Sequence, residues 1–185
     1  MSFYVQLAIF VALAAALVAV IFTLRNRQAA QRAASLPNLV GNPPPAPAGS
    51  FTRRSLEGIG TIEWPSGPEW EGTGNQLYND KLGLVLLIQN QIQSFGGREQ
   101  AYLESYNQVN LRDAPNWERG PEQVGQVGGM AAASTSGRFH NGTPMVTRDY
   151  LFFAAFTTVL LQSRVPASHA DALAITDYLA STFRR

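Results

Sequence analysis

The stretch FYVQLAIFVALAAALVAVIFTL, residues 3–24, decides the organisation of this chain because it contains no charged side chain. Only Gln6 and Thr23 interrupt its apolar character, and neither residue is ionisable. As an α-helix rising about 1.5 Å per residue, it would extend roughly 33 Å, enough to cross a hydrocarbon core about 30 Å thick. The stretch therefore predicts one membrane-spanning helix at the N-terminus.

A cleaved signal peptide is the alternative interpretation of this stretch. Such a peptide has a basic segment before a shorter apolar core, and a small-residue cleavage site after it. Here only Met1 and Ser2 precede the apolar residues, and the one weak cleavage candidate, near Gln28-Ala29-Ala30, lies beyond two arginines. These features favour an anchor that is not cleaved.

Arginines follow the apolar stretch directly, at Arg25, Arg27 and Arg32. Lys and Arg beside a span tend to stay on the cytoplasmic side of the membrane. We therefore expect a single-pass protein of an inner (cytoplasmic) bacterial membrane, with residues 25–185 in the cytoplasm. The same arginines lie where anionic lipid headgroups would meet them, which predicts lipid contacts.

Small side chains are frequent within the predicted span. Five alanines at three- and four-residue steps share one helix face: Ala8, Ala12, Ala15, Ala16 and Ala19. Such a face lets another helix approach closely in lipid, which predicts packing against other membrane-spanning subunits. The alternative is that alanine is simply common in anchors of alanine-rich proteomes, and both interpretations stay open.

Composition excludes several function classes. Charged residues make up 15% of the chain and its net charge is +1, whereas proteins average about 25% charged residues. The chain therefore lacks the strongly basic character expected for binding nucleic acid. It contains no cysteine, which excludes disulfides, thiolate metal ligands and cysteine nucleophiles.

Proline divides the chain into three parts. Residues 25–36 are good helix formers that should continue the membrane helix until Pro37 stops it, so the anchor and its juxtamembrane helix occupy 1–36. Five prolines within 37–50 predict an extended, semi-rigid linker. Residues 51–185 then form one globular domain of ordinary size.

The domain carries mixed secondary-structure signals. Residues 58–64 alternate in polarity and 83–93 are apolar and β-branched, which predicts strands, while helical spacing predicts a helix over about 98–109. The polar segment 110–120 is expected to be a loop. The eleven residues 151–161 are too few for a second span, so we expect buried strand there.

A hairpin is the clearest local signal in the domain. Strand-like residues over 124–139 and 143–153 flank Asn141-Gly142, the pair that best tolerates positive φ in a tight turn. Residues 156–163 add a further strand. Ser168 then resembles a helix N-cap, which predicts a terminal helix to about residue 183 whose apolar face is formed by Ala172, Ile175, Leu179 and Phe183.

No catalytic, cofactor or metal site stands out in the sequence. Ser168, His169 and Asp171 lie almost in a row, but capping explains the serine and the aspartate without catalysis. Neither His140 nor His169 has a neighbouring residue at a spacing suited to metal ligation. The glycines of a phosphate loop would be followed by Lys-Ser or Lys-Thr, and that pattern is missing after Gly125, Gly128 and Gly129.

The three tryptophans allow two interpretations. Trp64, Trp70 and Trp117 lie in or near turn-rich segments, where they either cover the core or stand exposed as interface anchors. Core positions are favoured for them as a group. The loop that combines tryptophan with arginine is nevertheless the best candidate for an interface on the domain, and its residues are Arg112, Asp113, Trp117, Glu118 and Arg119.

Several segments together resemble a known family. They are GTIEWPSG over 60–67, the strand over 82–93, the helix around 99–106, the paired strands beside Asn141-Gly142, and the ending ASTF over 180–183. In this order they resemble the PsbP-like α/β/α sandwich family, which includes the extrinsic PsbP protein of photosystem II and the bacterial DcrB lipoproteins. The chain departs from DcrB, whose anchor is a lipidated cysteine, and from PsbP, which lies on the lumenal face.

The resemblance implies an α+β fold with an antiparallel sheet, and a non-enzymatic domain that docks on a larger membrane assembly. We expect an accessory subunit of a multisubunit membrane complex, either a photosynthetic reaction-centre or light-harvesting complex or a respiratory one. A membrane-tethered module that captures a small ligand or a soluble partner is the alternative. An enzyme is the least favoured class, because no nucleophile–base pair or metal-ligand set is visible.

Overall fold

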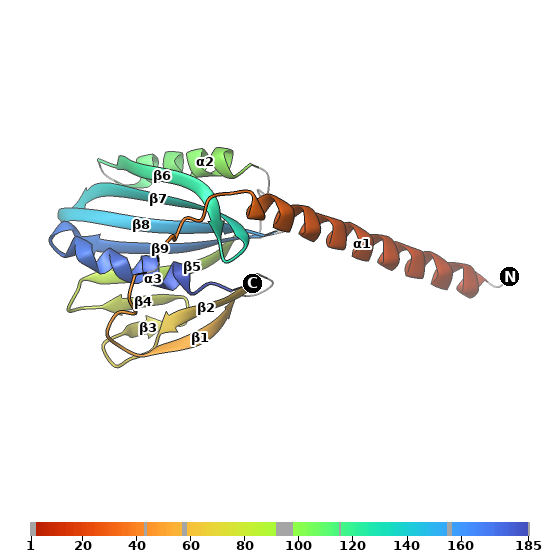
Figure 1. Ribbon diagram of the computed structural model, residues 1–185, viewed down its shortest axis with the longest axis horizontal. Helices are drawn as coiled ribbons and strands as arrows, with labels where there is room; N and C mark the ends of the chain where they lie inside the picture. Colours follow the sequence, from red (N-terminus) through yellow and green to blue (C-terminus); the bar gives the residue numbers. More distant parts are fainter. Residues whose placement is uncertain are drawn as a thin grey trace.

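The computed structural model describes residues 3–42, 44–56, 59–91, 98–114, 116–154 and 157–184. Helix α1 (Phe3–Ala34) projects as one long rod from an end of the globular domain (Figure 1). The helix is long and apolar enough to cross a membrane, with a mean hydropathy of 2.9 in its most apolar window, and none of that window is buried against the domain. The span and the domain are therefore spatially separate parts of the molecule.

A seven-stranded antiparallel sheet forms the centre of the domain, in the order β3-β4-β5-β9-β8-β7-β6. Its strands are β3 (Glu71–Thr73), β4 (Gln76–Asn79), β5 (Leu84–Gln91), β6 (Glu118–Val127), β7 (Met130–Asn141), β8 (Thr143–Phe153) and β9 (Thr158–Pro166). A separate hairpin pairs β1 (Phe51–Leu56) with β2 (Gly60–Pro65). The helices of the domain are α2 (Glu99–Asp113), the 3₁₀ helix η1 (Ala167–Leu173) and α3 (Ala174–Ser181).

Each face of the sheet is covered by a different layer (Figure 1). Alternate residues of a strand point to opposite faces, so Leu84, Leu86 and Ile88 enter the larger core, together with α3 and the β1–β2 hairpin. The smaller core lies on the other face, where α2 packs on Leu151 and Phe153. The predicted α+β fold with an antiparallel sheet between helical layers is thus confirmed.

The glycine turns set the strand boundaries. Asn141 and Thr143 pair across Gly142, whose φ is +72°, so the predicted hairpin is confirmed. The expectation of one strand over 124–139 is wrong, because Gly128 and Gly129 break it with φ values of +56° and +79°. Two successive positive φ angles make the tight turn that joins β6 to β7.

Helix α2 is longer than predicted. It continues to Asp113, so Arg112 and Asp113 are helical and the expected loop over 110–120 begins four residues later. Ala114 ends the helix in an extended conformation, with φ −111° and ψ 122°. That conformation is the one favoured before a proline, and Pro115 follows in the sequence.

The predicted cap of the terminal helix is wrong. Pro166 occupies the position before η1, with φ −54°, and Ser168 lies inside the helix, where its Oγ is 3.1 Å from His169 Nδ1. The fixed φ of proline suits a helix start, which explains why the helix begins before the serine. The predicted apolar face is confirmed, because all four of its residues belong to the larger core: Ala172, Ile175, Leu179 and Phe183.

The first residues of the proline-rich segment are docked on the domain and do not form a free tether. Leu39 donates its backbone N–H to Gln126 O at 3.0 Å, and Gln126 donates to Pro37 O at 2.8 Å. This short parallel bridge lies along β6, the edge strand of the sheet. Gly125 makes the approach possible, since a Cβ there would lie 2.4 Å from Pro37 O and 2.6 Å from a methyl group of Leu39.

Gly125→Ala should lower the free energy of unfolding of the detergent-solubilised chain by about 1–3 kcal/mol, because the added methyl group would overpack this contact. Urea unfolding followed by tryptophan fluorescence measures the change. Gly41→Ala is the matched control, since nothing lies within 4 Å of its Cβ position and such changes stay within about 0.5 kcal/mol. Equal effects of both substitutions would contradict the docking of this segment.

Candidate functional site at the anchor–domain junction

The last turn of α1 is part of the core of the domain. Ala33 is fully buried in the smaller core, and Leu36 packs against the same cluster. Together with the bridge of Pro37 and Leu39 to Gln126, these contacts form a junction between α1 and the domain. The junction fixes the direction in which α1 leaves the domain.

An ion pair strengthens the junction. Arg32 Nη2 of α1 donates to Glu99 Oε2 of α2 at 2.8 Å, and the glutamate side chain is only 2% exposed. Glu99 is the first residue of α2, where the partial positive charge of the helix N-terminus also favours a carboxylate. A buried carboxylate needs such partners because its transfer from water is costly. The pair therefore connects α1 to α2 specifically.

The junction also sets the distance between the domain and the apolar stretch of α1. Ten residues separate Leu24 from Ala34 within the continuous helix α1, a rise of about 15 Å. Arg25 and Arg27 lie in this interval, beside the apolar stretch, where the sequence predicts lipid contacts. The predicted alanine face consists of Ala8, Ala12, Ala15, Ala16 and Ala19. All five residues are exposed along α1, and none contacts the described part of the domain.

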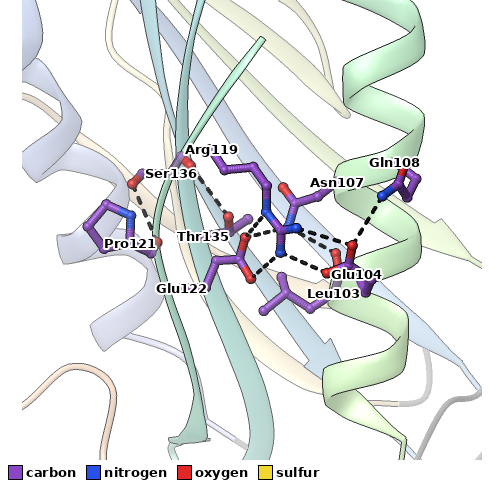
Figure 2. A network of polar contacts seen from close by, with 9 residues as sticks. All are labelled: Leu103, Glu104, Asn107, Gln108, Arg119, Pro121, Glu122, Thr135 and Ser136. Atoms are coloured by element: carbon purple, nitrogen blue, oxygen red, sulfur yellow. Dashed lines mark hydrogen bonds and ion pairs between the residues drawn. The ribbon is translucent and has the colours of Figure 1, made fainter.

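Arg119, one of the predicted interface residues, forms its ion pairs with residues of the same domain (Figure 2). Its guanidinium donates to Glu104 of α2 at 2.8 and 3.1 Å and to Glu122 of β6 at 2.8 and 2.9 Å. Asn107 donates to the same Glu122 at 2.8 Å. The network ties α2 to the edge of the sheet, and the hydrogen bond from Arg119 lowers the pKa of Glu104.

Trp117, one of the predicted interface residues, is not an exposed anchor and takes the core position favoured for the tryptophans as a group. Its side chain is buried, and the indole ring lies where a Cβ on Gly137 would be, at 2.2 Å. It also packs against Phe139, with the ring centroids 6.2 Å apart. The absence of a side chain at Gly137 is therefore what makes room for the tryptophan ring.

The other predicted interface residues lie at the surface. Arg112 is exposed and pairs with its neighbour Asp113 at 2.6 Å, while Glu118 is exposed at the start of β6.

A buried polar cluster lies beneath α2. Tyr106 Oη donates to Asp149 Oδ2 at 2.8 Å, and Gln162 Nε2 donates to Tyr106 Oη at 2.6 Å. Asp149 is fully buried, and burial raises its pKa to about 7, although Tyr106, Gln162 and the charge of Arg164 offset part of the rise. Burial and the neighbouring Asp149 raise the pKa of Tyr106 well above its usual range, so the phenol remains a donor.

Sequence reasoning missed Glu99 and Asp149. No pattern in the sequence relates Glu99 to Arg32, 67 residues earlier. A signal for Asp149 was present, because Asp149, Leu151 and Phe153 occupy alternate positions of one strand and must share a face. That alternation places a carboxylate on a buried apolar surface.

The described residues offer little for catalysis. No group of three or more His, Asp or Glu side chains within them could hold a metal ion. His140 and His169 are both exposed, and His169 Nδ1 lies 3.1 Å from the hydroxyl of its neighbour Ser168. Two adjoining hollows of about 400 and 530 Å³ lie at the end of the sheet away from α1, and they share Glu118, Arg138, Val146 and Ala170 in their walls.

Comparison with known proteins gives a likeness of fold. No protein-family model matches the chain, and no curated protein matches it in sequence. Among solved structures, it is similar to LpqN of Mycobacterium tuberculosis, described as involved in cell envelope biogenesis, at 11% identity and a TM-score of 0.51, over 73% of this chain and 90% of LpqN.

Two further solved structures show lower similarity. The cyanobacterial PsbP protein (CyanoP) of Synechocystis sp. PCC 6803 has 11% identity and a TM-score of 0.46, over 78% of this chain and 97% of that protein. The Ran-binding protein Mog1p of Saccharomyces cerevisiae has 16% identity and a TM-score of 0.43, over 73% and 88%. The structural neighbours thus include a PsbP protein, in agreement with the loose resemblance inferred from the sequence.

Arg32→Ala should lower the free energy of unfolding by about 1–3 kcal/mol, because the buried carboxylate of Glu99 loses its guanidinium partner. In a Glu99→Gln background the same substitution should cost less, which a double-mutant cycle of urea unfolding measures. Arg27→Ala, at an exposed arginine of the same helix, is the control. Identical losses in both backgrounds would show that the two residues do not interact.

Trp117→Ala should cost about 3–5 kcal/mol of unfolding free energy, the range for removing a large buried aromatic side chain. Thermal unfolding monitored by circular dichroism checks this value. An exposed interface residue would instead change stability by no more than about 0.5 kcal/mol. A loss of that small size would restore the interface interpretation of this residue.

Proposed function

We propose that this chain is a non-enzymatic, single-span accessory subunit that docks on and stabilises a multisubunit membrane complex. The observation that supports the proposal is the junction itself. Arg32, Ala33 and the bridge at Leu39 attach the membrane helix firmly to the domain. A subunit that caps an assembly benefits from one fixed pose, because little orientational freedom is then lost on docking.

The span provides the second contact of the proposed subunit. Its exposed alanine face suits close packing against other membrane helices, which is how helices associate in lipid. The arginines after the span place the domain on the cytoplasmic side of an inner membrane in this proposal. Arg25 and Arg27 would contact anionic headgroups there, together with the exposed part of Arg32.

A membrane-tethered binding module is the second candidate. It is favoured by the two adjoining hollows at the far end of the sheet, whose volumes of about 400 and 530 Å³ fall within the usual range of ligand pockets. The docked linker counts against it, since a module that captures soluble partners gains reach from a free tether. We therefore rank this function below the accessory subunit.

Native-gel mass spectrometry of the tagged chain, extracted from its own membranes in mild detergent, tests the proposal. We expect the chain to migrate at stoichiometric level with a large complex, and photosynthetic and respiratory complexes are the hosts to look for. Migration of the chain alone would contradict the accessory-subunit function.

Insertions of alanine between Arg27 and Gln28 sharpen this test, because each residue turns the helix by about 100° and lengthens it by about 1.5 Å. Two alanines rotate the domain by roughly 200° about α1, whereas four rotate it by roughly 40° and raise it by about 6 Å. We expect two alanines to release the chain from the complex more completely than four. Equal retention of both variants would indicate a tethered module whose orientation is unimportant.

A further inference from the structure

The carboxyl group of Asp149 occupies an unusual position in the domain. It lies on β8, near the middle of the sheet, is fully buried, and contacts Tyr106 of α2. Its Oδ2 accepts a hydrogen bond from Tyr106 at 2.8 Å, and the Gln162 amide is 3.5 Å away. No side chain of the described residues donates to Oδ1, and a backbone hydrogen bond from Ser163 lowers the pKa of the carboxyl in part. An ionised carboxylate would be poorly compensated at this site.

Few charged groups surround this carboxyl. Tyr106 of α2 is titratable but remains neutral, and among the described residues Arg164 of β9 supplies the positive charge that acts on this carboxyl. Thr135 of the neighbouring strand β7 and Thr147 of β8 itself lie on the same face. Glu122 of β6 accepts a hydrogen bond from Asn107 and is paired with Arg119. The charge of Arg119 is therefore already balanced by Glu122 and does not compensate Asp149.

The helix that covers Asp149 is the same helix that holds the anchor. Glu99 at the start of α2 pairs with Arg32 of α1. Tyr102 and Leu103, one turn further, pack in the smaller core with Ala33 and Leu36. Tyr106 on the next turn reaches Asp149. One face of α2 therefore contacts the end of α1 and the buried carboxyl in succession.

We propose that Asp149 and α2 form a pH-sensitive latch, in which the protonated carboxyl keeps α2 on the sheet beside the docked end of α1, and the ionised carboxyl releases α2 and weakens the attachment of α1. Ionisation favours any state in which water reaches the carboxylate, and lifting α2 is the direct route to such a state. Release of α2 removes Glu99 from Arg32 and takes away Tyr102 and Leu103, which α2 contributes to the smaller core. The end of α1 keeps its packing on β7 and β6 and the bridge at Leu39, so its attachment to the domain is weakened.

The direction of the effect follows from the pKa values. With α2 docked, burial raises the pKa of Asp149 to about 7, whereas an exposed aspartate has a pKa of about 3.9. The docked state is therefore fully stabilised below about pH 4, and it loses stability as the pH rises toward 7. The opening equilibrium should increase roughly 50-fold between pH 5 and pH 7 and level off above that range.

Hydrogen–deuterium exchange of the full chain in lipid nanodiscs tests the latch, with protection factors corrected for intrinsic exchange at each pH. Peptides covering residues 27–40 and 99–113 should lose protection together, roughly 50-fold between pH 5 and pH 7. Asp149→Asn should abolish this pH dependence in both segments. Asp113→Asn is the matched control, since this carboxyl lies on the same helix but is exposed, and it should leave the dependence unchanged.

A second variant keeps the test independent of how well Asp149→Asn folds. The Tyr106 hydrogen bond lowers the pKa of Asp149, so Tyr106→Phe should shift the pH at which protection levels off to a higher value. The latch is overturned by pH-independent protection in the unsubstituted chain, or by pH dependence that survives in Asp149→Asn. It is equally overturned if α2 loses protection while residues 33–39 keep theirs.

Discussion

The packing of α2 on the sheet is the interaction on which the rest of the molecule depends. This helix buries Tyr102 and Leu103 against Leu151 and Phe153, and the same small core accepts Ala33 from α1. Arg119 adds charged hydrogen bonds between α2 and β6, but these are exposed and contribute modestly. The apolar contacts therefore dominate, and a core of this size leaves α2 among the less strongly held elements of the domain.

Two features of this region have opposite effects on how firmly α1 is attached to the domain. The ion pair of Arg32 with Glu99 fixes the anchor to the domain, whereas the buried Asp149 makes the docking of α2 dependent on proton concentration. The larger core, which contains α3 and the β1–β2 hairpin, shares none of these groups. The domain thus combines a stable half with a half whose attachment responds to conditions. Such a division suits a subunit that takes up a defined orientation within an assembly.

Local chemistry in the sequence accounts for much of the fold. The uncharged stretch predicts α1, the Asn141-Gly142 pair predicts the hairpin, and helical spacing predicts the buried face of α3. The break at Gly128-Gly129 was missed because apolar residues continue on both sides of it. The site was harder to predict, since Glu99 meets Arg32 only through the tertiary fold. Trp117 was left between core and interface because its burial depends on Gly137, twenty residues away.

The short bridge between Leu39 and Gln126 also affects how the domain meets other copies of itself. Strand β6 is an edge of the sheet, and an edge exposes backbone groups that can pair with a foreign strand. Pro121 and the irregular register between Arg119 and Glu122 protect the first half of β6. The linker protects the second half. Proteolysis near residue 41 that separated the domain from α1 would therefore uncover a site for intermolecular β-pairing, so the segment that follows α1 also protects the domain against aggregation.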